Sequence, residues 1–221
     1  MHPVQKHILY NLITNPDLPY SKIKPKEVEG NLFMYHLKLL INEGLIQKRP
    51  DGRYELTPKG QIFAENLSLE SFKPRIQPKI VTLIACQNSK GEFLLYKRKR
   101  QPYLGLIGFP YGKIHLGETV LQAATRELEE KTGLSAQLSH RGDVYLTSFY
   151  QTSLLSQTFC HIFFAINPAG ELLTDSPIGQ CFWESIKKID KNNFIPGFAD
   201  IYYLITKNTR KFFFDEFTYY L

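Results

Sequence analysis

Several features are scarce in this 221-residue sequence, and each absence excludes a class of protein. No run of apolar residues approaches 18, so we expect no transmembrane helix. Residues 1–16 lack an apolar stretch followed by a small-residue cleavage site, which argues against a secretory signal and for a cytoplasmic protein. Cys86, Cys160 and Cys181 are far apart and form no CxxC pair, so we expect reduced core thiols rather than disulfides.

The overall composition is that of a globular protein. Hydrophobic residues make up 43% of the chain and charged residues 22%, which is ordinary for a globular protein. The length of 221 residues allows one large domain or two small ones. The net charge is +6, but residues 1–70 hold 9 basic against 8 acidic residues, whereas residues 71–221 hold 18 against 13. The positive charge therefore does not single out the N-terminal part as a nucleic-acid binder.

Residues 1–69 combine helical spacing with one hairpin signal. Apolar residues recur at helical intervals in two stretches, and Pro50-Asp51-Gly52 is a turn between two short strands. Thr57 is a suitable N-cap for a last helix, because Pro58 follows at the first helical position. The expected elements are helices over 3–14, 21–26, 31–43 and 57–67, with strands over 45–49 and 53–56.

This order of elements resembles a winged helix-turn-helix domain, with Tyr35–Gly60 similar to the recognition helix and wing of transcription regulators. The resemblance implies a domain over 1–69 that binds DNA, commonly as a homodimer on two half-sites. Its third helix would enter the major groove and its wing would contact phosphates. The alternatives are a solvated face, or a module that binds protein. The residues nominated for DNA are Asn31, Tyr35 and Lys38 on the helix, and Lys48, Arg49 and Arg53 on the wing.

Residues 70–79 are expected to be a linker, because they hold two prolines and three cations among few apolar positions. A second domain over 80–221 follows. Strands are expected over 80–85, 93–96, 144–150 and 158–166, and an amphipathic helix over 119–132. Strands of this kind around helices predict an α/β two-domain protein whose second domain is layered α/β/α.

The segment from Gly112 to Leu134 carries the chemistry. Residues 112–117 are expected to form a loop, and Thr119 is expected to cap a helix that ends at Gly133. Glu127 and Glu130 are three apart and so share one helix face. Carboxylates that converge on one point repel each other unless a cation lies between them, and Mg²⁺ or Mn²⁺ holding a diphosphate is a natural occupant.

The spacing resembles the Nudix box, which implies a Nudix fold with a mixed sheet. Eight positions match: Gly112, Glu118, Arg126, Glu127, Leu128, Glu130, Gly133 and Leu134. The resemblance implies that Glu118, Glu127 and Glu130 hold the metal. It also implies that Glu127 or Glu130 activates water while Arg126 orients a glutamate. A nucleotide-type ligand would then contact Tyr111, Gly112, Lys113, Arg98 and Arg100.

Two positions depart from the family pattern. Lys131 stands where the family has the second glutamate of a Glu-Glu pair, usually a metal ligand. Because Lys131 is four residues after Glu127, its ammonium can fold back onto that carboxylate and take the place of a metal. Alternatively, the remaining glutamates and a backbone carbonyl still hold one ion. Tyr111 replaces a glycine, and its ring either closes over a ligand or packs against Phe109.

Other features leave alternatives open. The run Lys97–Arg100 either meets ligand phosphates or is a solvated edge, which we favour. His161 is expected to be a hydrogen-bonded residue within an apolar strand, and Trp183 either stacks on a base or fills the core. The aromatic tail at 212–214 is either an edge strand or a dimer contact.

Lys131 decides which function we expect. Loss of one charged ligand weakens a multi-carboxylate metal site and slows its chemistry. We therefore expect a DNA-binding transcription regulator that senses a nucleotide such as ADP-ribose, with weak or absent hydrolysis and possibly no metal cofactor. The alternative is an active Mg²⁺-dependent hydrolase of nucleoside diphosphate-linked substrates, with the first domain as an accessory.

Overall fold

The computed structural model describes residues 1–207 and 212–221, and the chain divides into two units, 1–77 and 78–221. The boundary falls inside the segment that we expected to be a linker. Each unit has its own hydrophobic core. Within the described residues, none of the helices combines the length and apolar character needed to cross a membrane.

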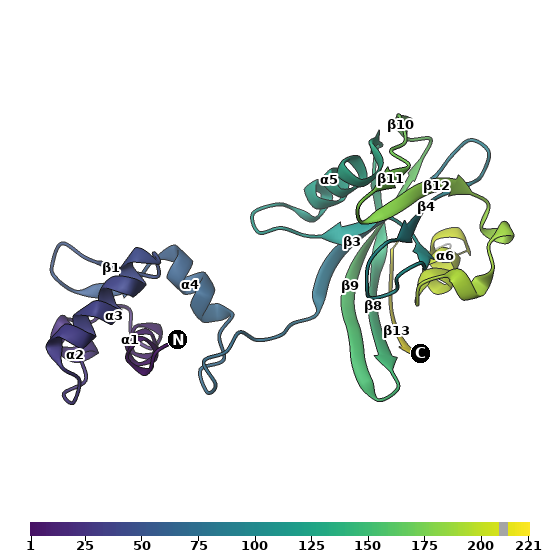
Figure 1. The fold of residues 1–221 in the computed structure, drawn as a ribbon. Helices are drawn as coiled ribbons and strands as arrows, with labels where there is room; N and C mark the ends of the chain where they lie inside the picture. The colour runs from purple at the N-terminus through teal and green to yellow at the C-terminus, as the bar shows by residue number, and fades with distance from the viewer. Residues whose placement is uncertain (208–211) are drawn as a thin grey trace. The chain divides into compact units, whose positions relative to one another are not determined.

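The first unit contains four helices and a two-stranded hairpin among its described residues (Figure 1). His2 and Gln5 form a capping box at the first helix, and the Thr57 hydroxyl accepts the Gly60 N–H at the last. Ile8, Phe33 and Leu37 are fully buried in the core between the helices. The elements are α1 (Pro3–Ile13), α2 (Tyr20–Ile23), α3 (Gly30–Asn42), β1 (Ile46–Lys48), β2 (Tyr54–Leu56) and α4 (Pro58–Glu65).

The first half of the expected linker belongs to the first unit. The N–H of Ser68 donates to the Lys73 carbonyl at 2.9 Å, and the N–H of Arg75 donates to the Asn66 carbonyl at 2.8 Å. Phe72 packs against the first core. This segment is therefore a turn held by backbone hydrogen bonds, and the low apolar content of 70–79 did not reveal it.

The second unit is built on a mixed sheet. The strand order is β11-β12-β4-β3-β9-β8-β13, with β5 beside β4 and β6 beside β3. The β3–β9 and β13–β8 pairs are parallel and the other pairs are antiparallel. The bounds are β3 (Lys79–Gln87), β4 (Phe93–Arg98), β5 (Ile107–Gly108), β6 (Tyr111–Lys113), β8 (Ser139–Tyr150), β9 (Ser153–Ile166), β11 (Asp175–Ser176), β12 (Gly179–Glu184) and β13 (Phe213–Tyr220).

Helices cover both faces of this sheet, which confirms the α/β layering with a mixed sheet (Figure 1). Alternate residues of β3 enter different cores, because side chains alternate along a strand. Leu83 packs with Ile201 of α6, whereas Ile84 packs with Leu128 of α5. The remaining elements are α5 (Val120–Thr132), a β7–β10 pair (Leu134–Ser135, Ala169–Gly170), short 3₁₀ helices over Ile186–Lys188 and Lys191–Asn193, and α6 (Phe198–Lys207).

Several local expectations need correction. The expected loop 112–117 begins as strand, because Gly112 pairs with Thr82 of β3. Strand β8 starts at residue 139 instead of 144. Two residues of the aromatic tail, 213 and 214, belong to edge strand β13, which is parallel to β8. Residue 212 precedes the strand, and residues 208–211 lie outside the described part of the chain.

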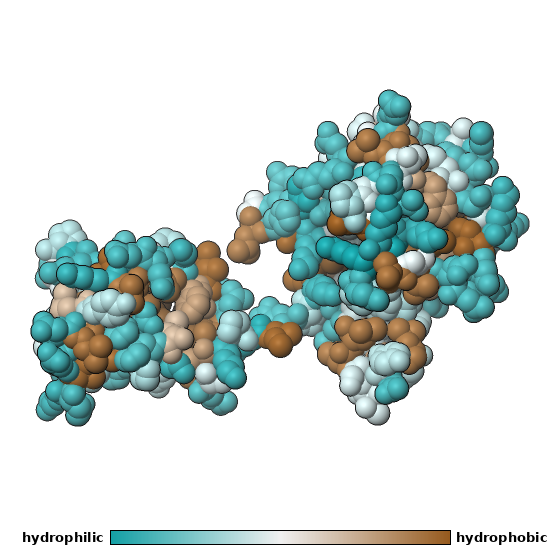
Figure 2. Space-filling view, in the orientation of Figure 1, coloured by the Kyte–Doolittle hydropathy of each residue, from teal (hydrophilic) through white to brown (hydrophobic). Residues whose placement is uncertain are grey.

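Hydrophobic residues also remain exposed on the second unit. Figure 2 shows an area of hydrophobic surface, in brown, over the ends of β8 and β9. Tyr150, Leu154 and Tyr220 are each more than half exposed there.

Candidate functional site

Helix α5 places the acidic residues beside β6. Thr119 and Gln122 form a capping box at its start, and Gly133 ends it in the left-handed conformation at φ 69°. Ala124 and Leu128 are buried against the sheet. This packing leaves a polar face of α5 directed along β6, where Arg126, Glu127, Glu130 and Lys131 line a cavity.

Arg126 is the centre of a hydrogen-bonded cluster that contains all three predicted glutamates. It donates two bonds to Glu118, from Nη2 to Oε1 at 2.7 Å and from Nε to Oε2 at 3.0 Å. Its Nη1 donates to Glu127 at 2.9 Å and to Glu130 at 3.1 Å. Nη2 also donates to the Lys113 carbonyl at 3.0 Å, which ties α5 to the end of β6. Arg126 therefore holds the three carboxylates close to one another.

This pairing has a clear electrostatic consequence. Hydrogen bonds from Arg126, and then from the backbone N–H of His115, lower the pKa of Glu118 to about 2. In return, hydrogen bonds to the glutamates of the cluster raise the pKa of Arg126, and the bond to Glu118 has the largest effect. Glu118 is thus a permanently ionised partner of Arg126 at neutral pH.

Glu127 is the most confined carboxylate of the cluster, with a side chain only 9% exposed. Its carboxyl group lies directly against Gly112, where an added Cβ would be 1.6 Å from Cδ of Glu127. A glycine is required at 112 for this reason, and not for its backbone angles. The close approach positions Glu127 between β6 and Lys131.

Lys131 occupies the centre of the site. Its Nζ lies 2.8 Å from Oε2 of Glu127 and also donates to the backbone carbonyl of Tyr111. The aromatic rings of Tyr111 and Tyr96 lie 5.3 and 5.9 Å from the ammonium. The predicted fold-back of Lys131 onto Glu127 is therefore present, and the ammonium neutralises that carboxylate.

The residues predicted to contact a ligand share one cavity of about 690 Å³ beside α5, the box cavity. Tyr111, Gly112, Lys113, Arg98 and Arg100 all line it, whereas Glu118 lies outside the lining. Sequence reasoning missed the contributions of Lys79 on β3 and of Ser156 and Thr158 on β9. Alternation along each strand was the available signal, but it does not tell which face of the sheet carries the cavity.

Arg98 corrects our preferred interpretation of the basic run. It is only 5% exposed, and it donates from Nε to the Pro102 carbonyl at 2.8 Å and from Nη1 to the Tyr111 hydroxyl. Lys97, Lys99 and Arg100 are exposed. Arg98 and Arg100 line the cavity, whereas Lys97 and Lys99 do not, so only part of the run is a solvated surface.

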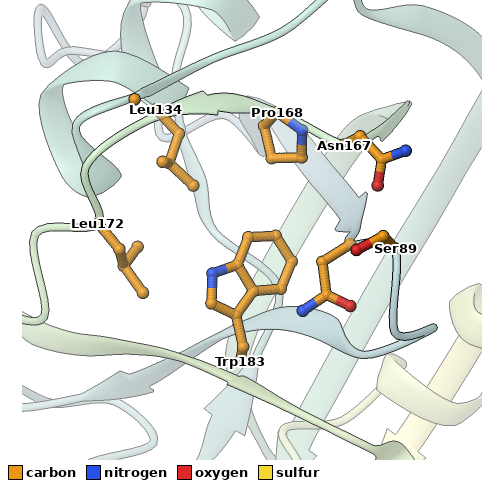
Figure 3. A pocket seen from close by; sticks show the side chains of 8 residues that line it. Ser89, Leu134, Asn167, Pro168, Leu172 and Trp183 are labelled. Atoms are coloured by element: carbon orange, nitrogen blue, oxygen red, sulfur yellow. The ribbon is translucent and has the colours of Figure 1, made fainter.

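Trp183 lines a different, smaller cavity of about 340 Å³. Figure 3 shows its indole among Leu134, Leu172 and Pro168. Trp183 also packs against the core beneath α5. Trp183 is not among the residues that line the 690 Å³ cavity, and the core packing that we gave as one alternative is present.

The residues nominated for DNA lie in two different environments. Asn31, Tyr35 and Lys38 are exposed on one face of α3. Arg49 and Arg53 both bind the side chain of Asp17, Arg49 through Nη1 at 3.1 Å. Their charges are therefore partly neutralised within the first unit. Lys48 is exposed and lies 5.9 Å from the ring of Tyr54.

The family to which the chain belongs follows from this geometry and from comparison with known proteins. A family model for the NUDIX domain matches residues 77–204, so the chain belongs to the NUDIX family. An ADP-ribose pyrophosphatase of Methanocaldococcus jannaschii is 32% identical over 98 residues, which cover 39% of this chain. The match covers 58% of that protein, so the chain spans little more than half of its length.

Two further similarities extend this result. An 8-oxo-dGTP diphosphatase of Haemophilus influenzae is 30% identical over 135 residues, covering 57% of this chain and 90% of that protein. The NUDIX domain of Shewanella oneidensis NrtR, solved with ADP-ribose, has a TM-score of 0.52 at 15% identity, covering 70% of this chain and all of that domain. The structural similarity shows a shared fold.

Proposed function

We propose that the cavity beside α5 binds a nucleoside diphosphate-linked molecule such as ADP-ribose, and that the chain hydrolyses the diphosphate slowly. The cations Lys79, Arg100 and Lys113 line the cavity and match a diphosphate in charge. ADP-ribose is the substrate named for one relative and the ligand named for one similar fold. The relatives, which are hydrolases by name, support this proposal better than a regulatory function.

Slow turnover is inferred from the position of Lys131. Mg²⁺ or Mn²⁺ is the cofactor implied by the family, but both oxygens of Glu118 and both oxygens of Glu127 already accept hydrogen bonds or ion pairs from cations. Lys131 also donates a hydrogen bond to the carbonyl oxygen of Tyr111, which would otherwise be a further oxygen ligand. In this arrangement the residues do not fit a divalent ion. An ammonium neutralises the carboxylates but supplies no Lewis acid, so the chemical step loses that assistance.

A hydrolysis panel tests this proposal. ADP-ribose, NADH and nucleoside triphosphates would be incubated with purified protein and Mg²⁺ or Mn²⁺, alongside Lys131→Glu. We expect wild-type turnover below about 1 s⁻¹, the low end of ordinary enzymes, and at least a tenfold gain in the variant, about 1.4 kcal/mol of barrier. Turnover of about 10 s⁻¹ by the wild type would contradict the role given to Lys131. Calorimetric titration with ADP-ribose measures binding separately.

A second candidate function is a transcription regulator whose first unit is a winged helix that binds DNA as a homodimer. It is supported by the helix–hairpin–helix order of the first unit and by the exposed face of α3. The pairing of Arg49 and Arg53 with Asp17 weighs against a phosphate-binding wing.

Selection of bound sequences from fragmented genomic DNA, with and without ADP-ribose, tests this function. Lys38→Ala should weaken DNA binding and lower its salt dependence, whereas Lys90→Ala in the second unit should not. Absence of sequence-specific binding by the full chain would remove this candidate.

A further inference from the structure

We propose that His140, Asp143 and His161 form a site for a transition-metal ion of the Zn²⁺ class, separate from the box cavity. One ligand atom from each residue, two imidazole nitrogens and a carboxylate oxygen, lies within 4.8 Å of the other two. Two neutral imidazoles and one carboxylate are a donor set that Zn²⁺ binds in proteins, with water in the fourth position.

A β-bulge brings the three side chains to one face. Residues 140 and 143 are three apart and would point to opposite faces of a regular strand. The register of β8 against β9 shifts between His140 and Gly142, so that His140 is opposite Phe163 and Asp143 is opposite His161. Phe163 and His161 are two apart on β9 and share a face. The bulge therefore turns the side chain of His140 to the same face as Asp143. Bulges often change the direction of a side chain in this way next to functional sites.

The distances suit a metal after a small expansion. His161 Nδ1 lies 2.7 Å and His140 Nε2 lies 2.9 Å from Oδ1 of Asp143. In a tetrahedral Zn²⁺ site, bonds of roughly 2.0–2.2 Å place neighbouring ligand atoms about 3.3 Å apart. Movement of about half an ångström at each contact opens the site. A bound metal would replace the direct contacts of both imidazole nitrogens with Asp143, and each ring would then coordinate through that nitrogen and carry its N–H on the other.

Packing holds both imidazole rings in place. His140 stacks on Phe163 at 4.9 Å and meets the edge of Phe212 at 5.2 Å. His161 packs edge-on against Phe159 at 5.1 Å, and its side chain is 16% exposed. The side chain of His140 is 35% exposed, so the fourth coordination position is open to water. Rings that are already oriented lose little entropy when they bind a metal.

The site is distinct from the box cavity but belongs to the same sheet. None of its three residues lines the 690 Å³ cavity. In the cross-strand register, Gly112 is followed by Thr82, His161 and Asp143 on consecutive strands β6, β3, β9 and β8. Strand spacing places His161 about 10 Å from Gly112. The metal would therefore tie β8 to β9 without touching Glu127.

Equilibrium dialysis of the full chain tests the proposal. After removal of bound metal by a chelator, the protein would be dialysed against Zn²⁺ with Mg²⁺ in excess to fill oxygen-only sites. We expect one Zn²⁺ per chain and, with Co²⁺, the visible absorption bands of tetrahedral coordination. His161→Gln, Asp143→Asn and His140→Gln should each weaken Zn²⁺ binding at least tenfold, because even partners that only support ligands change affinity by about that much.

The matched control is His2→Gln. His2 and His36 form another histidine pair, stacked at 4.0 Å in the first unit, and this variant should leave Zn²⁺ binding unchanged. Circular dichroism verifies that each variant is folded, and His140→Gln, at the most exposed ligand, is the variant least sensitive to packing. The proposal is overturned if the folded wild type binds no Zn²⁺, or if folded His140→Gln and His161→Gln both retain full affinity.

Discussion

The ammonium of Lys131 lies 2.8 Å from Oε2 of Glu127, one helical turn earlier on α5, and also contacts the Tyr111 carbonyl. A single side chain thereby joins α5 to β6.

Removal of the Lys131 charge should destabilise the second unit. Lys131→Met leaves the Glu127 carboxylate, only 9% exposed, with Arg126 as its remaining cation. We expect a loss of about 1–3 kcal/mol in the free energy of unfolding, below the full cost of breaking a buried pair because Arg126 stays. Urea denaturation measures it. Glu130→Gln is the control: its side chain is 61% exposed, so it should change stability by less than about 0.5 kcal/mol.

Stability should fall in acid because of Glu118. Arg126 lowers the folded-state pKa of Glu118 to about 2, below its ordinary value near 4.5. A depressed carboxyl pKa stabilises the fold above the unfolded-state pKa, and this contribution disappears as the pH falls towards 2. Thermal denaturation between pH 7 and pH 2 should show a fall that starts near pH 5. Glu118→Gln should be less stable at pH 7 and should show a smaller fall; an unchanged slope would contradict the pairing.

Substitution of Gly112 by alanine should disrupt the site. The new Cβ would lie 1.6 Å from Cδ of Glu127, so β6 and α5 must separate. Overpacking of this kind costs about 1–3 kcal/mol or more. Gly30→Ala is the matched control, since nothing lies within 4 Å of its added Cβ, and it should be neutral or slightly stabilising. Equal stability of the two variants in urea would show that Glu127 does not press on Gly112.

The ring of Tyr111 should contribute to ligand binding. Tyr111 lines the cavity, and its hydroxyl accepts a bond from Arg98. Tyr111→Phe keeps the ring, so ADP-ribose affinity measured by calorimetry should stay within about twofold. Tyr111→Ala should weaken affinity about tenfold, because stacking on a base contributes about 1–3 kcal/mol. Trp183→Phe, in the other cavity, should have no effect; a similar loss there would point to a different binding place.

Local signals predicted the elements that depend on local chemistry. Thr119 and Gly133 mark the ends of α5 because caps satisfy backbone groups within one turn of the helix. Strand β8 was predicted too short, since His140 and Asp143 are polar and alternation fails across the bulge. The hydrogen bond expected for His161 is present, but its partner lies 18 residues earlier and no spacing rule identifies it.

The sequence alone predicted the family and the spacing of the box residues on α5, with Lys131 four residues after Glu127, because these depend on residue identity and on helical spacing. Only the tertiary structure decided that Lys131 reaches the Tyr111 carbonyl, that Arg98 is buried and that two histidines meet Asp143. The Lys131–Tyr111 contact joins a helix to a strand and the His161–Asp143 contact joins two strands, and the register between such elements is set by the packing of the whole sheet rather than by any local run of residues.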